Sequence, residues 1–297
     1  MSMQVATMPE SASASATAAN ITASVRDAIR PGSPRHLAVL FSGSPQRPLL
    51  EAVYAFEAEL RRIVASESHE AAHARLQWWR GELDRLAAGR PNHPLAVALL
   101  PLRGRRDVEL GLLHELLVAA DLDLSRLTYL SWQELEAYLF RAAGAAQTLI
   151  AAVLAGDRPL TPAEREFARR LGAALRQSEI LIDIERDVRR GRLYAPLQAL
   201  ETAGIDPASF AARPLDPAHR PFLADWQARV GRELAALPEA LDSKALRAAQ
   251  RHGLVLATLQ ERCLERRPLQ ATRRLTSSEP GSFSRVWTAW RTALRYA

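Results

Sequence analysis

Apolar residues recur every three or four positions along most of this chain, which is the spacing of one face of an α-helix. Leu50, Val53 and Leu60 follow this spacing in one segment, and Leu76 and Leu83 follow it in the next. Alternating runs of β-branched residues, which are typical of strands, are missing from the sequence. The pattern therefore predicts an all-α protein.

Short breaks that carry Pro, Gly or Asp separate the helical segments. Further helices are predicted at 93–101, 106–120, 131–155, 162–188, 216–236, 241–266 and 282–295. Thr161, Pro162 and Glu164 form the pattern of a capping box with proline in the first turn, and Gly191 is expected to end the helix that they begin. The short loops predict a single helical domain at 35–297, after an Ala/Ser-rich tail at 1–34 that is expected to be disordered.

The longest apolar stretch, Ala137 to Gly156, is interrupted by Arg141 and Gln147. It falls short of the roughly 18 to 20 uninterrupted apolar residues that span a bilayer, so a buried core helix is expected. Any membrane contact is therefore expected to be peripheral, through basic or amphipathic surfaces.

The charge balance is basic, with 39 Lys and Arg against 33 Asp and Glu, and Lys244 is the single lysine. Such a balance suits anionic membranes, phosphorylated substrates or nucleic acid, and an arginine bias also arises from a GC-rich genome. No nucleic-acid partner is predicted, because the arginines are dispersed among acids without a recognisable binding motif. The lone Cys263 excludes a disulfide framework and indicates a reducing compartment. We therefore expect a cytoplasmic protein. If it binds a membrane, we expect it to lie at the periphery of the inner membrane.

Two carboxylates mark the end of the 162–188 segment. Asp183 and Asp187 are four residues apart, so on a helix they share one face. A pair placed in this way can hold Mg²⁺, which completes its shell with water and phosphate oxygens. The alternative is a solvated helix end, where the two aspartates form ordinary pairs with Arg186 and Arg190.

The stretch from Asp183 and Asp187 to Gly191–Pro196 resembles the second aspartate-rich motif and the Gly-Arg-x-Tyr-x-Pro segment of squalene and phytoene synthases. The resemblance extends along most of the chain in the order of the family, through Tyr54–Phe56, Leu76–Arg80, His93–Leu95, Asp121–Asp123, Glu134–Tyr138 and Ala143–Gly144. It implies the isoprenoid synthase fold, a helical bundle around a central apolar cavity. Enzymes of this family hold two prenyl diphosphates with Mg²⁺ between facing aspartate motifs and condense them head to head.

The resemblance also implies roles for individual residues. The catalytic residues would be Asp183, Asp187 and Tyr194, with Mg²⁺ bound by the two aspartates. The substrate-binding residues would be Arg61, Tyr54, Arg190, Arg192 and Tyr138.

The first aspartate motif of the family is missing. Alignment on Tyr54–Phe56 puts Arg61 and Ala65 where the family has two aspartates, and neither residue binds magnesium. Glu57 is expected to be an i,i+4 partner of Arg61. Arg176 and Glu179 stand where the enzymes usually show Gln and Asn, and Gln147 replaces a glycine.

Two hypotheses follow from this asymmetry. In the first, the chain is a divergent member that binds an isoprenoid diphosphate or lipid with weak or no condensing activity. In support of this hypothesis, the sequence resembles a mitochondrial complex I assembly factor of the same superfamily. The resemblance lies in the 59–62 segment, in Leu76–Trp79 and in a closing helix with Trp287 and Trp290. A protein of this kind would act through a protein partner. In the second, the chain is an active Mg²⁺-dependent prenyltransferase in which Arg61 or Arg192 contacts the diphosphate directly.

Overall fold

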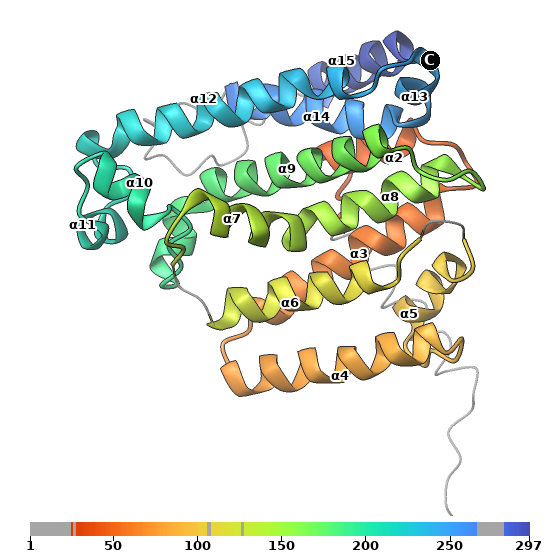
Figure 1. Ribbon diagram of the computed structural model, residues 1–297, viewed down its shortest axis with the longest axis horizontal. Coiled ribbons are helices and arrows are strands. Elements are labelled where there is room, and N and C mark those ends of the chain that lie inside the picture. The colour runs from red at the N-terminus through yellow and green to blue at the C-terminus, as the bar shows by residue number, and fades with distance from the viewer. Residues whose placement is uncertain (1–24, 26–27, 106–107, 126–127, 266–281) are drawn as a thin grey trace, which may run out of the picture.

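The computed structural model describes residues 25, 28–105, 108–125, 128–265 and 282–297. Within these ranges every regular element is a helix, and most of the helices lie roughly side by side in a stacked bundle (Figure 1). The prediction of an all-α bundle is therefore confirmed. The predicted tail up to residue 24 lies outside the described residues.

The first half of the chain forms α2 beside α14, the outer helix α4, and the helices between them (Figure 1). Its α-helices are α2 (Pro34–Leu40), α3 (Arg47–Val64), α4 (His69–Ala87), α5 (Pro94–Leu99), α6 (Gly111–Ser125), α7 (Trp132–Leu139) and α8 (Ala145–Ala155). A 3-10 turn, η1 (Leu100–Leu102), extends α5, and a π-helical turn, η2 (Phe140–Gly144), joins α7 to α8.

The second half adds the longest helix and the layer beyond it (Figure 1). Its α-helices are α9 (Pro162–Arg189), α10 (Leu197–Thr202), α11 (Pro207–Ala212), α12 (Arg220–Ala236), α13 (Lys244–Ala249), α14 (Arg251–Glu265) and α15 (Ser282–Arg295). Two 3-10 turns, η3 (Pro217–His219) and η4 (Leu237–Ala240), flank α12.

The ends of α9 follow the sequence signals. The Thr161 side chain accepts a hydrogen bond from the Glu164 amide, and the Glu164 side chain accepts one from the Thr161 amide, which completes the predicted capping box. Just past the other end, Gly191 adopts a φ of 72°, a conformation that glycine tolerates better than other residues. These signals fix the length of the helix that carries Asp183 and Asp187.

Two predicted helices are interrupted in the structure. The 131–155 segment contains the π turn at η2, where the α9 backbone approaches so closely that a Cβ on Gly172 would lie 2.5 Å from the Gly144 backbone. The 241–266 segment ends at Gln250 and restarts as α14. The short helices α10 and α11 were not predicted, because six residues are too few to show a helical period.

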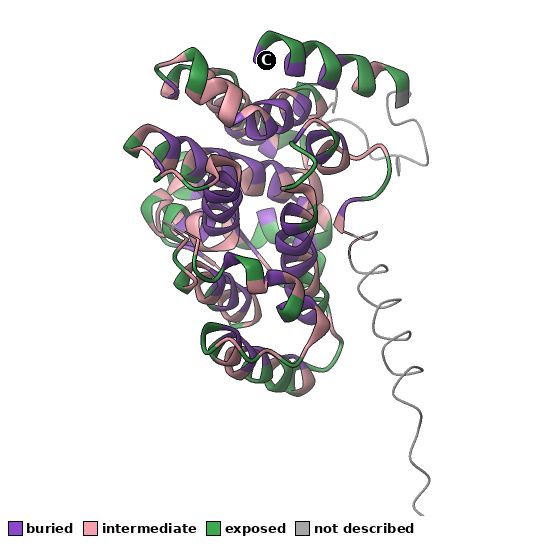
Figure 2. Ribbon diagram, turned by 90° about the vertical axis from the view of Figure 1, so that its right-hand side faces the viewer, coloured by how far each residue is buried: buried purple, intermediate pink, exposed green. Residues whose placement is uncertain are grey.

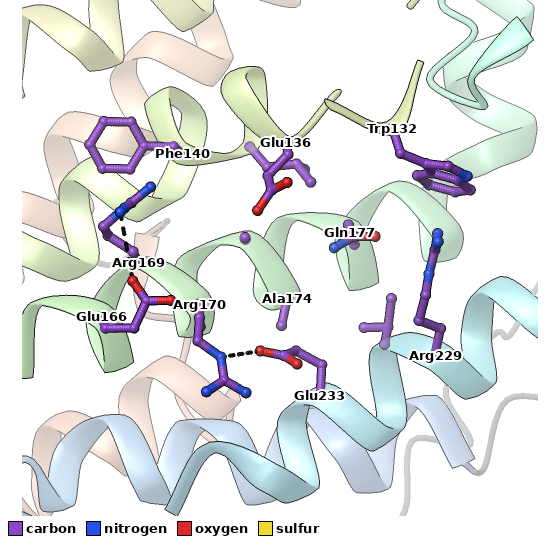
Figure 3. A pocket seen from close by; sticks show the side chains of 13 residues that line it. Trp132, Glu136, Phe140, Glu166, Arg169, Arg170, Ala174, Gln177, Arg229 and Glu233 are labelled. Carbon is purple, nitrogen blue, oxygen red and sulfur yellow. Dashed lines mark hydrogen bonds and ion pairs between the residues drawn. The ribbon is translucent and has the colours of Figure 1, made fainter. Parts of the chain in front are cut away.

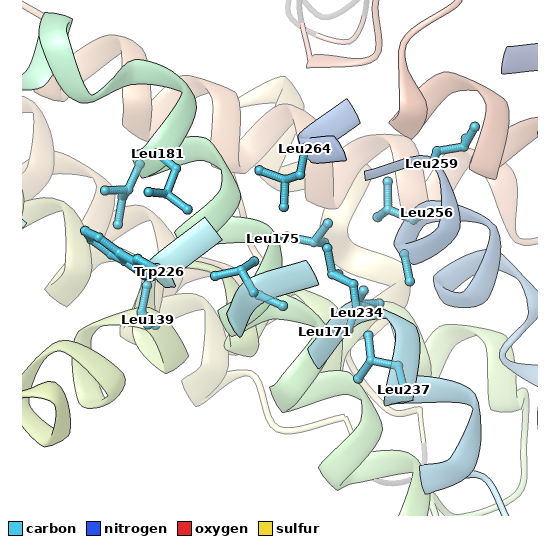
Figure 4. Close-up of a cluster of buried hydrophobic side chains, with 14 of the residues drawn as sticks. Leu139, Leu171, Leu175, Leu181, Trp226, Leu234, Leu237, Leu256, Leu259 and Leu264 are labelled. Carbon is cyan, nitrogen blue, oxygen red and sulfur yellow. The ribbon is translucent and has the colours of Figure 1, made fainter. Parts of the chain in front are cut away.

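Two large hydrophobic clusters, with a third small one at Ala151, Ala152, Leu160 and Ala168, hold the bundle together. One joins α9, α12 and α14 through leucines and Trp226, as Figure 4 shows. The other lies among α3, α4, α5, α6 and α8, and it includes Ile29. Ile29, before α2, therefore packs against the helices of this cluster.

The most apolar part of the chain lies inside the bundle. Trp132–Ala155 is long and apolar enough to cross a membrane by length and composition, but 72% of its most apolar window is buried within the protein. Buried residues fill the inner faces of the helices, and exposed residues lie mainly on the outside (Figure 2). The stretch thus has the burial of a core helix, as the sequence predicts.

Candidate active site

One face of α9 carries the polar residues of the candidate site. Arg176, Glu179, Asp183 and Asp187 follow one another at steps of three or four residues, so they form a row along the helix. Asp183, the third residue of this row, is partly exposed and forms an ion pair with Arg186 at 2.5 Å. The predicted helical face therefore exists, together with one of the two ordinary ion pairs expected at a solvated helix end.

Asp187 is buried, with 6% of its surface exposed. Burial raises the pKa of its carboxyl group above the usual value, against the lowering effects of Arg176 and Arg186. The shift shows that this carboxylate is poorly compensated in its present surroundings. The predicted metal-binding role of Asp187 stays a prediction.

A network of ion pairs occupies the space between α3 and α9. Arg61 lies 3.4 Å from Glu57 and 3.4 Å from Glu179. Arg35, at the start of α2, lies 3.2 Å from Glu57 and 3.0 Å from Glu179. Two guanidinium groups and two carboxylates therefore alternate in this space. The resemblance to the family would place a metal ion here, opposite the second aspartate motif.

The charges of this cluster neutralise one another. Burial opposes ionisation of Glu179, yet Arg61, Arg35 and Arg176 lower the pKa of its carboxyl group to about 2. Burial also opposes the charge of Arg35, but Glu57 and Glu179 raise its pKa above the usual value. The buried ions are thus held as charged partners of each other, and the expected pairing of Glu57 with Arg61 is confirmed.

Arg176 extends the network toward α6 and α7. Its guanidinium group donates to the Tyr138 hydroxyl at 2.6 Å and to the Tyr194 hydroxyl at 3.1 Å. The Tyr194 hydroxyl donates in turn to Asp123 at 2.7 Å, and Asp123 lies 3.6 Å from Arg176. Tyr138 and Tyr194, two of the three tyrosines assigned to the site, therefore contact Arg176, and burial raises the pKa of each phenol.

Tyr54 lies next to this network, on the side of Arg35, and is fully buried. Its ring lies under the Arg35 guanidinium, 4.9 Å from ring centroid to carbon, and its hydroxyl is 2.8 Å from His252 Nε2 on α14. Ser42 binds the other ring nitrogen of His252 at 2.9 Å. In this structure Tyr54 therefore supports Arg35 from the protein interior, and its assigned contact with substrate stays a prediction.

The two arginines after α9 have different surroundings. Arg192 donates to the backbone carbonyls of Val64 at 2.9 Å and Asp123 at 3.0 Å, which lie near the carboxyl ends of α3 and α6. A cation there satisfies free carbonyls and opposes the negative end of each helix dipole. Arg190 is exposed at the C-cap of α9. Of the two, Arg190 has the more accessible position for a diphosphate.

A small cavity lies beside the network. Its volume is about 30 Å³, and its lining combines Arg61, Glu57, Asp123, Tyr138 and Arg176 with apolar residues of α3, α6 and η2. Asp183 and Asp187 are not among the residues that line it. This space holds about one water molecule, so a prenyl chain would require the surrounding helices to move apart.

A larger cavity of about 490 Å³ lies between α7, η2, α9 and α12. It uses other faces of these helices than the network does, and Figure 3 shows Arg170 directed toward Glu233 and Arg229 beside the ring of Trp132. Gln177, next to Arg176 in sequence, lines this outer cavity and accepts a hydrogen bond from Trp226. The outer cavity contains none of the predicted site residues.

Comparison with known proteins identifies the family of this chain. The profile of the squalene/phytoene synthase family matches residues 30–279, which is most of the chain. This chain belongs to the squalene/phytoene synthase family. It is 33% identical over 135 residues to a phytoene synthase of Arthrospira platensis and 30% identical over 178 residues to phytoene synthase 3 of Zea mays.

These matches cover 42% and 58% of this chain and 44% and 42% of the two relatives. The matched stretch thus spans less than half the length of either relative. Among solved structures, a dehydrosqualene synthase in complex with ligand aligns with a TM-score of 0.70 at 14% identity, over 95% of this chain and 98% of that one. A squalene synthase, HpnC of Alicyclobacillus acidocaldarius, aligns with a TM-score of 0.58 at 20% identity, over 84% and 96%. Identities this low establish the isoprenoid synthase fold alone.

The α3 side of the inner site offers no ligands for a metal ion. Glu57 and Glu179 are already paired with arginines, and Arg61 and Ala65 supply no carboxylate. In the described part of the chain, no group of three or more His, Cys, Asp or Glu residues is arranged to hold a metal ion. The α3 side therefore does not fit Mg²⁺, and the pair Asp183 and Asp187 remains as the predicted position for a single ion.

Sequence reasoning missed the role of Arg35. This residue lies at the start of α2, far from either motif in sequence, and only the fold brings it to Glu57 and Glu179. Arg176 and Glu179 were singled out as departures from the family pattern, and they prove to be the centre of the network. Arg176 and Glu179 differ from the family pattern, carry opposite charges and share one helix face. This combination is the sequence signal that could have predicted the network.

Proposed function

We propose that this protein is a divergent member of its family that binds an isoprenoid diphosphate or lipid and has weak or no condensing activity. The observation that carries the proposal is the ion-paired Arg61, whose guanidinium group lies 3.4 Å from both Glu57 and Glu179. Head-to-head condensation needs two diphosphates held together, and this arginine replaces a ligand for the metal that would hold one of them.

The electrostatic argument favours a single diphosphate. With an effective dielectric constant of about 20, a guanidinium group roughly 8 Å from Mg²⁺ costs about 4 kcal/mol, where an aspartate would contribute a similar stabilisation. Arg35 adds a second cation on the same side. The α3 side of the site therefore opposes metal binding through two charges as well as through the missing carboxylates.

The α9 side keeps what one diphosphate requires. Asp183 and Asp187 can bind Mg²⁺, whose charge neutralises diphosphate oxygens when it is bound. Arg190, exposed at the end of α9, can bind the same group directly, and Arg61 faces the small cavity with 43% of its side chain exposed. Apolar residues of α3 and α6 line the adjoining wall, where the prenyl chain would lie.

Titration calorimetry with farnesyl diphosphate tests this proposal. We expect one diphosphate per chain, with Mg²⁺ dependence that Asp183→Asn removes. The matched control is Asp84→Asn, which changes an exposed carboxylate on α4 and should leave binding unchanged. Binding of two diphosphates per chain would contradict the proposed single site. So would a Mg²⁺ dependence that Asp183→Asn leaves unchanged.

The second candidate is an active Mg²⁺-dependent prenyltransferase of squalene or phytoene biosynthesis. It is favoured by the retained spacing of Asp183 and Asp187 and by Tyr194, which contacts both Arg176 and Asp123. In that case Arg61 would bind the second diphosphate in place of a metal, and its pairs with Glu57 and Glu179 would open during turnover. C30 or C40 product that disappears with Arg61→Met would support this alternative.

A non-condensing protein of this kind also suits an assembly role for a respiratory complex, acting through a protein partner. The support is the resemblance to the assembly-factor branch, including the closing helix with Trp287 and Trp290. Deleting the gene and measuring the assembled complex tests this role. An undiminished complex in the deletion strain would remove the assembly role and leave the ligand-binding proposal intact.

A further inference from the structure

The C-terminal helix α15 lies at the outer edge of the bundle, against α14 (Figure 1). Its inner face is small and well packed, with Ala289, Ala293 and Tyr296 buried. Thr288 accepts a hydrogen bond from Arg262 of α14 at 2.5 Å. These contacts hold the helix in one orientation, so its outer face is presented in a fixed direction.

The outer face of α15 is apolar. Phe283 is 80% exposed, Trp287 49%, Trp290 43%, Val286 41% and Leu294 56%. These five residues, here called the α15 stripe, are spaced so that they share one side of the helix. Figure 2 shows exposed residues along the outer side of this helix and buried ones toward the bundle.

The α15 stripe concentrates exposed apolar surface. It contains five of the ten large apolar side chains that are exposed within the described ranges. Its two indole rings lie 4.9 Å apart, so they form one continuous aromatic patch. Single exposed apolar residues are common on proteins, whereas a contiguous patch marks an interaction surface.

The charges beside the stripe have one sign. The helix contains Arg285, Arg291 and Arg295 and no acidic residue. Arg291 and Arg295 are exposed and flank the stripe. An apolar face with tryptophan and flanking arginines is the composition of a helix that lies in the plane of a membrane surface and favours anionic lipids.

We propose that the α15 stripe docks this protein on the surface of an anionic lipid membrane, with the indoles at the headgroup boundary and the arginines on lipid phosphates. The area of the stripe favours lipid over a second copy of the chain. A helix of this length is about 21 Å long and about 10 Å wide, which gives roughly 200 Å². A stable protein interface needs roughly 800 Å² from each partner. The proposal does not depend on ligand binding inside the bundle.

Flotation of the purified full chain with vesicles tests the proposal. We expect binding to vesicles of phosphatidylcholine with phosphatidylglycerol and much weaker binding to phosphatidylcholine alone. Trp287→Ser with Trp290→Ser should reduce partitioning at least about tenfold. Arg291→Glu and Arg295→Glu should each reduce it by about fivefold or more.

Matched controls come from the opposite edge of the bundle. Trp78 on α4 is 46% exposed, so Trp78→Ser removes an indole of similar accessibility, and Arg75→Glu changes an exposed charge on the same helix. Both controls should bind vesicles like the unchanged protein. Circular dichroism of each variant confirms that it is folded.

Three results would overturn the proposal. The first is the absence of vesicle binding by the unchanged chain, which would mean that another part of the chain covers the stripe. The second is a dimer that the tryptophan substitutions convert to a monomer without any lipid binding, which would make a second copy the occupant. The third is equal loss of binding in the α15 and α4 variants, which would show that the attraction is not specific to this helix.

Discussion

Arg61 on α3 and Glu179 on α9 form an ion pair of 3.4 Å across the centre of the bundle. Family resemblance places an aspartate at the first position and an asparagine at the second, so both partners differ from the enzymes. The two changes complement each other, because the new cation meets a new anion. The space between α3 and α9 is therefore filled by a network of paired opposite charges.

Restoring the missing carboxylates should restore metal dependence. Arg61→Asp with Ala65→Asp removes one cation and places new carboxylates near Glu57 and Glu179. We expect Mg²⁺ to strengthen diphosphate binding by at least about tenfold in this variant, since reversing one charge near the ion is worth several kcal/mol. Calorimetry with and without Mg²⁺ measures the effect.

The control for this variant is Arg62→Asp, which makes the same charge change at the next residue on the exposed side of α3. It should leave the Mg²⁺ dependence unchanged. An equal or weaker Mg²⁺ effect in the double variant would mean that Arg35 and Arg176 already exclude metal from this side.

Arg35 should be a large contributor to stability. It is the shared partner of Glu57 and Glu179, and only 14% of its side chain is exposed. Arg35→Met leaves two buried carboxylates with less compensation, which should lower the free energy of unfolding by about 3 to 5 kcal/mol. Urea denaturation measures this loss.

An exposed ion pair provides the comparison for Arg35. Arg169 and Glu166 are both more than half exposed and lie 3.6 Å apart. Arg169→Met should cost less than about 1 kcal/mol. Similar losses for the two variants would show that the buried network does not hold α2, α3 and α9 together.

Stability should fall on acidification because of His252. Burial lowers the pKa of its imidazole to about 4 from the usual value of 6.5, so the folded state keeps it neutral while the unfolded chain takes up a proton. The stabilising effect is present above pH 6.5 and is lost as the pH falls toward 4. Between pH 7 and pH 5 the loss should be about 2 kcal/mol.

Urea denaturation of His252→Gln at both pH values tests this assignment. The variant should be less stable at pH 7, because Tyr54 and Ser42 lose their partner, and it should lack the additional loss at pH 5. His114→Gln, at a partly exposed position on α6, should keep the acid sensitivity of the unchanged protein. An unchanged pH dependence in His252→Gln would assign the effect to other groups.

The sequence predicts the helices well because their signals are local. The capping box at Thr161 and the glycine at 191 mark the ends of α9, and apolar spacing marks its buried face. The π turn at η2 was not predicted, because it depends on the contact between Gly144 and Gly172. That contact joins helices that are separate in sequence.

The sequence predicted several residues of the candidate site but not the residues that they contact. Spacing places Asp183 and Asp187 on one face, and the family pattern identifies Arg61 as anomalous. Neither observation shows that Arg35 reaches Glu57 and Glu179, nor that Arg192 binds the backbone of two other helices. Such contacts depend on how the helices pack, and no local sequence pattern records that arrangement.

Product analysis tests the central claim most directly. The purified protein is incubated with Mg²⁺ and farnesyl or geranylgeranyl diphosphate, and its C30 and C40 products are quantified over long times. We predict at most trace product, because positioning two reactants carries roughly 7 to 11 kcal/mol of a barrier and only the α9 side retains an anchor. Abundant C30 or C40 product that Asp183→Ala abolishes would contradict the account and establish the chain as an active prenyltransferase.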